Sequence, residues 1–127
     1  MEKKLGYLLV VMLLLSGCAT IGSIERNYAL IDYSDGIDKE EAILIGKKDL
    51  ISADPKTKLK YKYRITGPLT GYDEKAGVWT ICFVPRYIVG NVDLSYRDTV
   101  YCLDVDRSSG EILASGEFPY SRYRTVK

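Results

Sequence analysis

The chain has 127 residues, and its 18 Lys and Arg against 17 Asp and Glu give a formal net charge of +1 at pH 7. This balance argues against general nucleic-acid binding, because such proteins carry a marked excess of basic side chains. Histidine is absent, which excludes Ser-His-Asp catalysis, Cys-His catalysis and histidine-ligated metal sites. The 11 tyrosines, against 2 phenylalanines and 1 tryptophan, are typical of a small β-rich domain.

The first residues have the composition of a signal peptide. Lys3 and Lys4 precede an uninterrupted, largely apolar run from residue 5 to residue 15. This run is too short to cross a bilayer as a helix, because the apolar core of a bilayer is about 30 Å thick. We therefore interpret residues 1–17 as a cleaved signal peptide.

Residues 15–18, Leu-Ser-Gly-Cys, resemble the bacterial lipobox. The resemblance implies cleavage before Cys18 and a diacylglyceryl group on its sulfur, so that the membrane is reached through an N-terminal lipid. The alternative is an ordinary secretory signal followed by an unrelated cysteine. In bacterial lipoproteins, an aspartate directly after the lipidated cysteine opposes sorting to the outer membrane. This chain has Ala19 at that position, so the resemblance favours an outer-membrane protein facing the periplasm.

The remaining residues, 18–127, suit one domain with one modest core. Residues 18–36 show no clear hydrophobic period, and we expect a lipidated N-terminus and a tether between membrane and domain. Within this segment, residues 28–33 are either a short strand or an extended lead-in. Residues 37–127 are expected to form a single α+β domain.

One helix is predicted from Asp38 to Asp54. Asp38 and Glu41 form a capping-box pattern, and Pro55 ends the helix because the residue before proline disfavours helical dihedrals. Two small residues on the apolar face would let the helix approach a sheet closely. The expected face consists of Ala42, Ile43, Gly46, Leu50 and Ala53, flanked by Leu44 and Ile51.

The chain after Pro55 predicts strands and turns. Residues 56–65 alternate strictly between basic and apolar or aromatic side chains, which predicts the first strand. Further strands are expected at 78–84, at 99–105 and from 111 onward, and residues 86–98 form either a long loop or an extra strand pair. The result is an α+β fold with one N-terminal helix packed on a four-stranded antiparallel meander sheet.

Cys82 and Cys102 form an even pair once Cys18 is lipidated, as expected in an oxidising compartment. If the apolar sides of both strands face the helix, pairing Phe83 with Tyr101 places the two cysteines opposite each other, at a separation suited to a disulfide. We predict this disulfide; the alternative is two free thiols. The pair lacks Cys-x-x-Cys spacing, which argues against a redox role.

The alternating cations of residues 56–64 are a candidate surface for anionic partners. Such a face suits anionic lipid headgroups, an acidic glycan or an acidic protein, whereas the alternative is a solvent-facing edge strand whose charges prevent aggregation. The residues are Lys56, Lys58, Lys60, Lys62 and Arg64.

Other motifs predict neither catalysis nor a bound metal. Residues 104–115 fail as a calcium loop, because the glycine comes one position late, at Gly110, and Ser115 replaces the final glutamate. Serine in Gly-x-Ser-x-Gly context is absent. We therefore expect no enzyme, no cofactor and no metal. A glycan-processing enzyme that uses two carboxylates is the distant alternative.

Two short stretches, residues 37–42 and 103–113, resemble the PepSY type of envelope domain, and residues 77–79, Gly-Val-Trp, are similar to a strand of nuclear-transport-factor-like immunity domains. The resemblance implies a cystatin- or PepSY-like helix curled against a sheet, with no functional residues transferred. We expect a lipid-anchored module that binds an envelope protein or anionic envelope polymer. The alternative is an inhibitor or immunity protein against an envelope-active toxin or protease.

Overall fold

The computed structural model describes residues 16–53, 59–88, 94–95 and 97–122, with side chains for all of these except residues 16–21, 60 and 122. The helices are α2 (Ser16–Ala29), α3 (Lys39–Ser52) and the single turn α4 (Leu59–Lys62). The strands are β1 (Leu69–Asp73), β2 (Val78–Phe83), β3 (Thr99–Asp106) and β4 (Ile112–Pro119), followed by the 3-10 turn η1 (Tyr120–Arg122).

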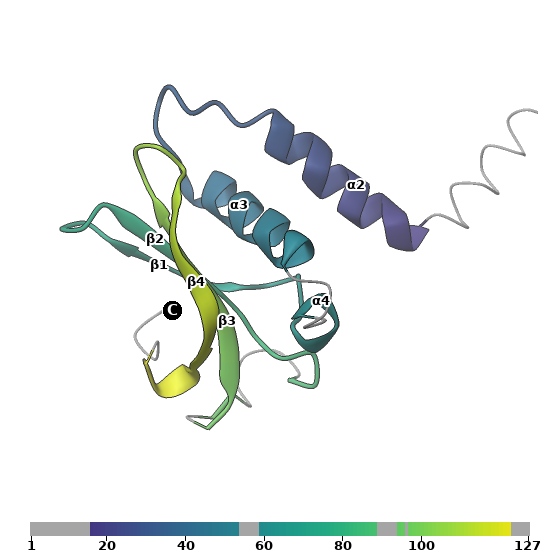
Figure 1. Cartoon of the computed structure of the whole chain (residues 1–127). Coiled ribbons are helices and arrows are strands. Elements are labelled where there is room, and N and C mark those ends of the chain that lie inside the picture. The colour runs from purple at the N-terminus through teal and green to yellow at the C-terminus, as the bar shows by residue number, and fades with distance from the viewer. Residues whose placement is uncertain (1–15, 54–58, 89–93, 96, 123–127) are drawn as a thin grey trace, which may run out of the picture.

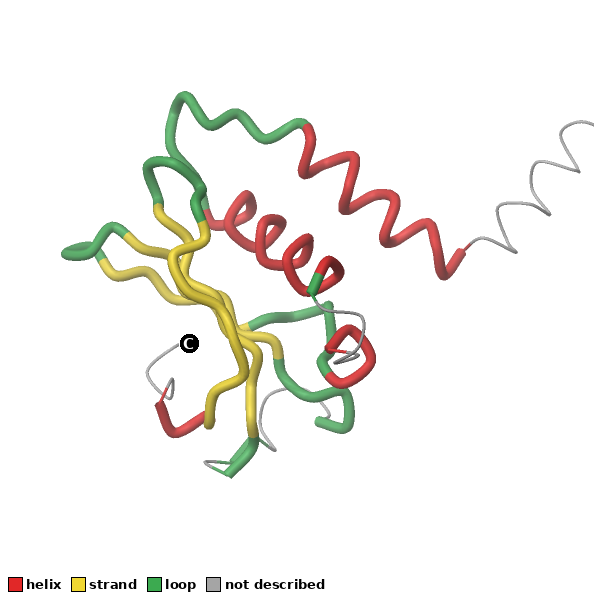
Figure 2. The backbone as a smooth tube through the Cα atoms, in the orientation of Figure 1, coloured by secondary structure: helices red, strands yellow, loops and turns green. Residues whose placement is uncertain are grey.

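The four strands form one antiparallel sheet in the order β1-β2-β3-β4, so each strand pairs with the next one along the chain. Helix α3 lies across one face of the sheet, and α2 runs antiparallel to α3 on its outer side (Figure 1). Figure 2 shows the same layers by secondary structure. The α+β class and the four-stranded antiparallel meander are as predicted.

Helix α3 begins with the predicted capping box. The backbone N–H of Glu41 donates to Asp38 Oδ1 at 2.8 Å, and the N–H of Asp38 donates to Glu41 Oε1 at 3.1 Å. The helix approaches the sheet closely at Gly46, where an added Cβ would lie 3.1 Å from Cγ2 of Ile81. The glycine therefore sets the spacing between helix and sheet.

The main core lies between α3 and the sheet. Ile81 and Leu103, from the two central strands, contact the buried face of α3, and Trp79 at the core's edge donates through Nε1 to the carbonyl of Ile37 at 2.9 Å. Ile45 is buried as well, although it lay outside the predicted helix face. The buried members are Ile37, Ala42, Ile45, Leu50, Leu59, Tyr63, Ile81, Phe83, Tyr101, Leu103 and Val105.

The predicted strand at 56–65 is wrong over residues 59–65, and residues 56–58 lie outside the described residues. Residues 59–62 form α4 instead, and Tyr63 makes only an isolated bridge to Pro85. Leu59 and Tyr63, four residues apart, are both buried, and the N–H of Tyr63 donates to the carbonyl of Leu59. A helical turn puts these two large residues on one face, and two of the three residues between them, Lys60 and Lys62, are good helix formers.

The first strand is β1, which follows Pro68 and contains Gly71. We predicted no strand at these positions. An edge strand tolerates Pro68 before its first residue and Gly71 inside it, because one side of an edge strand makes no hydrogen bonds to another strand.

Residues 16–29 form a helix, whereas we expected no regular structure from residue 18 to residue 36. Ile24 of α2 is buried, Tyr28 packs against the main core, and Glu25 forms an ion pair of 3.4 Å with Lys48 of α3. Residues 28 and 29 end this helix, and residues 30–36 form a loop, so no strand occurs at 28–33.

The segment 86–98 is described only in part, because residues 89–93 and 96 lie outside the described residues. Its described positions contain no strand. Tyr87 and Ser95 both bond to the carboxylate of Asp98, the tyrosine hydroxyl at 2.6 Å and the serine N–H at 2.9 Å. These contacts hold the two described ends of the segment together.

Candidate functional site

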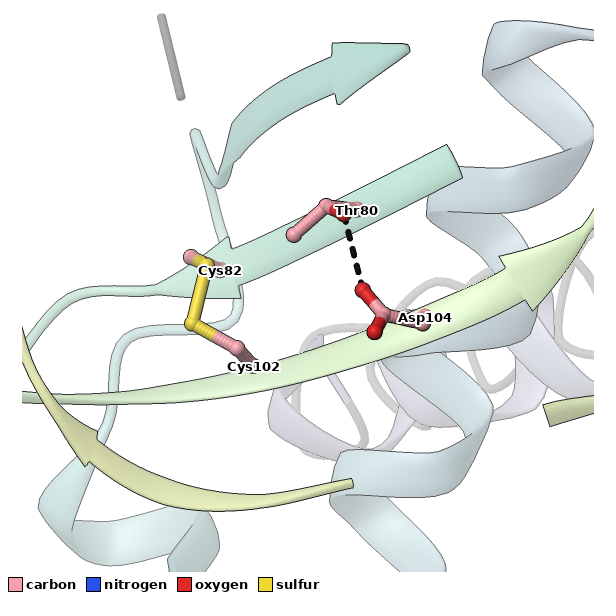
Figure 3. The surroundings of a disulfide bond; sticks show 4 residues. All are labelled: Thr80, Cys82, Cys102 and Asp104. Carbon is pink, nitrogen blue, oxygen red and sulfur yellow. Dashed lines mark hydrogen bonds between the residues drawn. A yellow bond between two sulfur atoms is a disulfide. The ribbon is translucent and has the colours of Figure 1, made fainter. Parts of the chain in front are cut away.

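Cys82 and Cys102 form a disulfide bond on the face of the sheet opposite α3 (Figure 3). The strands pair as predicted, with Phe83 opposite Tyr101 and Cys82 opposite Cys102. Because side chains alternate along a strand, this register turns both sulfurs away from the helix. The pairing predicted from the alternation of apolar residues is therefore confirmed.

The disulfide is covered by a second, smaller apolar cluster. Val84 and Val100 are buried beside the two cysteines, which are themselves at most 1% exposed. Partly buried neighbours complete the cover: Leu69, Leu94, Phe118 and Tyr120. A disulfide shielded in this way suits a structural crosslink, because thiol exchange requires access to a sulfur atom.

One row farther along the same face, Thr80 Oγ1 donates a hydrogen bond of 2.8 Å to Asp104 Oδ1 (Figure 3). Gly71 of β1 and Ala114 of β4 occupy the same row on either side. The apolar cover thus stops after the disulfide row, and small or polar residues follow it. Sequence reasoning gave this row no role.

Cys18 lies in the first half of α2, six residues before the buried Ile24. Its side chain is outside the described part of the chain, and lipidation of this residue stays a prediction. The helix is continuous from Cys18 to Ile24, so no loop separates the predicted lipid site from the first buried residue.

Among the described residues, the predicted basic face does not lie on a strand, because residues 59–62 form α4. Lys56 and Lys58, together with the side chain of Lys60, lie outside the described residues. Lys62 forms an ion pair of 2.6 Å with Glu117 of β4. Arg64 donates through Nη1 to the carbonyl of Ile88 at 3.1 Å. Both described side chains of this set, Lys62 and Arg64, therefore bond to neighbouring parts of the chain.

The ion pair between Lys62 and Glu117 continues into the core through Tyr63. The buried tyrosine donates its hydroxyl to Glu117 Oε2 at 2.8 Å, and its oxygen lies 3.0 Å from Thr99 Oγ1. The lysine lowers the pKa of Glu117, and the carboxylate raises the pKa of Lys62, while burial raises the pKa of Tyr63. This cluster fixes α4 to β4 and leaves no unpaired acid or base.

A second buried hydroxyl fixes α3 to β3. Tyr101 donates to Asp49 Oδ2 at 2.7 Å. Burial, followed by the hydrogen bond and negative charge of Asp49, raises the pKa of Tyr101 to about 12. Both tyrosines therefore stay protonated at neutral pH and act as hydrogen-bond donors.

Two hollows lie along the junction of α2 and α3. Two adjoining hollows of about 380 and 430 Å³ share Asn27, Leu44 and Lys47 and together form one groove. Leu30, at one end of the groove, is 78% exposed. The remaining lining residues are Ser23, Ile24, Ile31, Asp38, Glu40, Glu41, Ile43, Ile65 and Thr66.

Sequence reasoning missed this groove because it did not predict α2. The signal was the spacing of Ile24, Tyr28 and Ile31, which are separated by four and then three residues. The groove combines apolar side chains on its floor with charged and amide groups on its rim. This composition suits a protein segment better than a small polar molecule.

Within the described ranges, no three His, Cys, Asp or Glu residues are grouped so that they could hold a metal ion. Among the same residues, no helix has the length and apolar character needed to cross a membrane. Comparisons with known proteins give no match to a family model, to a curated protein or to a solved structure.

Proposed function

We propose that this chain is a lipoprotein of the bacterial cell envelope that binds a partner and catalyses no reaction. Its signal peptide, residues 1–17, would be removed, and the new N-terminal residue, Cys18, would carry the lipid. The observation that supports this most strongly is the division of the three cysteines. Cys82 and Cys102 are bonded to each other, and Cys18 follows the apolar run at the position of a lipobox cysteine.

The location proposed for the anchored domain is the periplasmic face of the outer membrane. Ala19 after the lipobox cysteine supports this location by resemblance to lipoprotein sorting. More than one acyl chain is needed for stable anchoring, and a diacylglyceryl group supplies two. The domain would thus stay at the membrane without a membrane-spanning helix.

The finer fold assignment is also a proposal: a PepSY- or cystatin-like domain, in which a helix is curled against an antiparallel sheet. Helix α3 across a four-stranded meander supports it. Helix α2 is an addition to that plan, and it creates the groove at its junction with α3.

The groove is the surface that we propose for partner binding. It presents the strongly exposed Leu30 together with Leu44, and a polar rim that includes Asn27 and Lys47. An envelope protein would bury the apolar groups and pair with the rim. An inhibitor or immunity protein would use the same surface, with a toxin or protease as the partner. An anionic polymer is less favoured at the groove, because Asp38, Glu40 and Glu41 line it and only Lys47 among its lining residues is basic.

Lipidation is tested by expressing the full chain and its Cys18→Ala variant in a two-membrane bacterium. We expect the wild type to enter the detergent phase and its N-terminal peptide to begin at a lipid-modified Cys18 by mass spectrometry. Cys18→Ala should stay unprocessed and lose the modification. The Cys82→Ala/Cys102→Ala variant is the matched control and should keep the lipid. Equal detergent partitioning and processing of Cys18→Ala would reject the lipoprotein assignment.

Partner binding is tested by crosslinking in cells with Leu44→Arg, which places a charge on the groove floor. The matched control is Leu113→Arg on β4, because Leu113 is 54% exposed and lies outside the groove lining. We expect a specific crosslinked species that Leu44→Arg loses and Leu113→Arg retains. A species that survives both substitutions would place the binding surface elsewhere.

A further inference from the structure

Acidic and basic side chains gather at opposite ends of the domain. Three loops converge at one end, where the N–H of Ile37 donates to the carbonyl of Arg107 and the N–H of Arg107 donates to the carbonyl of Gly77. We call this the acidic end, made up of residues 30–41, 73–77 and 106–111. It carries nine acidic and three basic side chains, a formal net charge of −6.

The opposite end of the domain has the opposite sign. There, α4 meets the strand ends, since the N–H of Arg64 donates to the carbonyl of Val84 and the N–H of Arg86 donates to the carbonyl of Lys62. We call this the basic end, made up of the described residues in 47–53, 59–66, 84–88, 94–99 and 117–121. Its described side chains include six basic and three acidic groups, a formal net charge of +3.

Helix α2 enters the domain at the basic end. It runs antiparallel to α3, so its first turns lie near the end of α3 and on the side of α4 (Figure 1). Ser23 and Ile24 line a hollow together with Ile65 and Thr66, which follow α4. At a rise of about 1.5 Å per residue, the six residues from Cys18 to Ile24 span about 9 Å. A lipid on Cys18 would therefore hold the basic end close to the membrane.

The basic end also carries exposed aromatic side chains of the kind found at membrane interfaces. Tyr61 of α4 is 62% exposed, and Tyr87 in the turn after Pro85 is 70% exposed. Lys62, Arg64 and Arg86 are their close neighbours along the chain. Tyrosine is enriched at the headgroup level of bilayers, and basic side chains there reach anionic phosphates.

We propose that the basic end is a membrane-contact surface for anionic phospholipid headgroups. It would place Tyr61 and Tyr87 at the headgroup level and direct the acidic end away from the bilayer. This proposal rests on the proposed lipidation of Cys18, which supplies the anchoring, whereas the segregated charge supplies the orientation. An anionic surface attracts the basic end and repels the acidic end within a Debye length of about 8 Å at physiological salt.

In this orientation, the groove would run roughly parallel to the membrane normal, with one end near the bilayer. The hollow near Ile24 and Ile65 would lie close to the headgroups, and the hollow near Leu30 and Glu40 would lie far from them. A partner would therefore reach the groove from its Leu30 end.

The test uses lipidated full-length chains reconstituted into vesicles that contain brominated phosphatidylcholine and phosphatidylglycerol. Bromine quenches tryptophan only at close range, so tryptophan placed at each exposed tyrosine reports its proximity to the bilayer. The variants are Tyr61→Trp and Tyr87→Trp at the basic end. The matched control is Tyr33→Trp at the acidic end, where Tyr33 is 41% exposed. The native Trp79 gives a constant background, measured in the wild type.

We expect bromine-dependent loss of fluorescence for Tyr61→Trp and Tyr87→Trp beyond that of the wild type, and no added loss for Tyr33→Trp. The loss should shrink when phosphatidylglycerol is replaced by phosphatidylcholine. Quenching of all three positions, of none, or of Tyr33→Trp alone would overturn the orientation, as would equal quenching in neutral vesicles. Mass spectrometry of the Cys18 peptide separates the two proposals: an unmodified Cys18 removes the lipoprotein assignment, whereas a lipidated but unoriented protein removes only this inference.

Discussion

The two faces of the sheet are closed by different means. The face under α3 is covered by large apolar side chains from the helix, the two central strands and Tyr63. Among the described residues, no α-helix covers the opposite face, which has a smaller apolar cluster built around Cys82 and Cys102. Burial and hydrogen bonds stabilise the first face, whereas a covalent bond between β2 and β3 supplements burial on the second. A domain of this size thus compensates for a thin second layer.

The largest difference between the two faces should appear when a side chain is truncated. Leu103→Ala, under α3, should lower the free energy of unfolding by about 2–5 kcal/mol, because it removes a buried side chain and leaves a cavity. Val100→Ala, three residues earlier on the disulfide face, should cost less, because the disulfide still holds its strand. Chemical denaturation of the two variants measures both values. An equal or larger loss in Val100→Ala would contradict the smaller role of burial on the disulfide face.

Removal of the disulfide tests the thinner face directly. Cys82→Ala/Cys102→Ala should cost about 3 kcal/mol in the chain-entropy model, given the 20-residue separation of the cysteines. Cys18→Ala should leave stability unchanged, because Cys18 is outside this crosslink. Thiol titration of the unreduced protein provides an independent check, and reactive thiols at both positions 82 and 102 would contradict the structure.

The spacing between α3 and the sheet gives a smaller effect. Gly46→Leu should cost about 1–3 kcal/mol, because its side chain would meet Ile81 and Leu103 of the packed face. Gly22→Ala on α2 is the matched control. An added Cβ there has no atom within 4 Å, and alanine should stabilise the helix by about 0.5–1 kcal/mol. Thermal unfolding that gives the two changes the same sign would show that α3 can shift away from the sheet.

The smallest expected change concerns the hydrogen bond between Tyr101 and Asp49. Tyr101→Phe should cost about 1 kcal/mol at neutral pH. The pKa of Tyr101 is raised from 10.0 to about 12, so the folded state favours the protonated hydroxyl. Its contribution is complete below pH 10 and is lost as the pH rises toward 12. The wild type should therefore lose more stability than Tyr101→Phe over that interval, as measured by denaturation at each pH. Parallel pH profiles would contradict the raised pKa.

Sequence patterns predicted the elements in which the residues that form the pattern also contact one another. The capping box of Asp38 and Glu41 marks the start of α3, because the two residues bond to each other's backbone. The alternation of Ile81 and Phe83 against Tyr101 and Leu103 fixed the register of β2 and β3 and hence the disulfide. In both cases, the residues that carry the pattern also make the contact.

Tertiary packing decided the elements that the sequence did not predict. The alternation of residues 56–65 fits a strand, but Leu59 and Tyr63 are both buried by a single helical turn. Helix α2 has few apolar positions, and Ile24 is buried only because α3 lies beside it. The groove depends on both helices, so its lining could not be predicted without α2. The charge segregation likewise depends on which loops converge at each end.

The position of the disulfide within the β2–β3 pair also bears on how the chain reaches its native fold. Slipping the two strands by one residue would turn one sulfur to the face under α3 and leave the other on the opposite face. A strand pair slipped in this way cannot contain the bond, and the bond, once formed, prevents the strands from slipping. Three cysteines allow three pairings, and modification of Cys18 during export would leave only one. Oxidation of this domain would then require no isomerase to sort wrong partners.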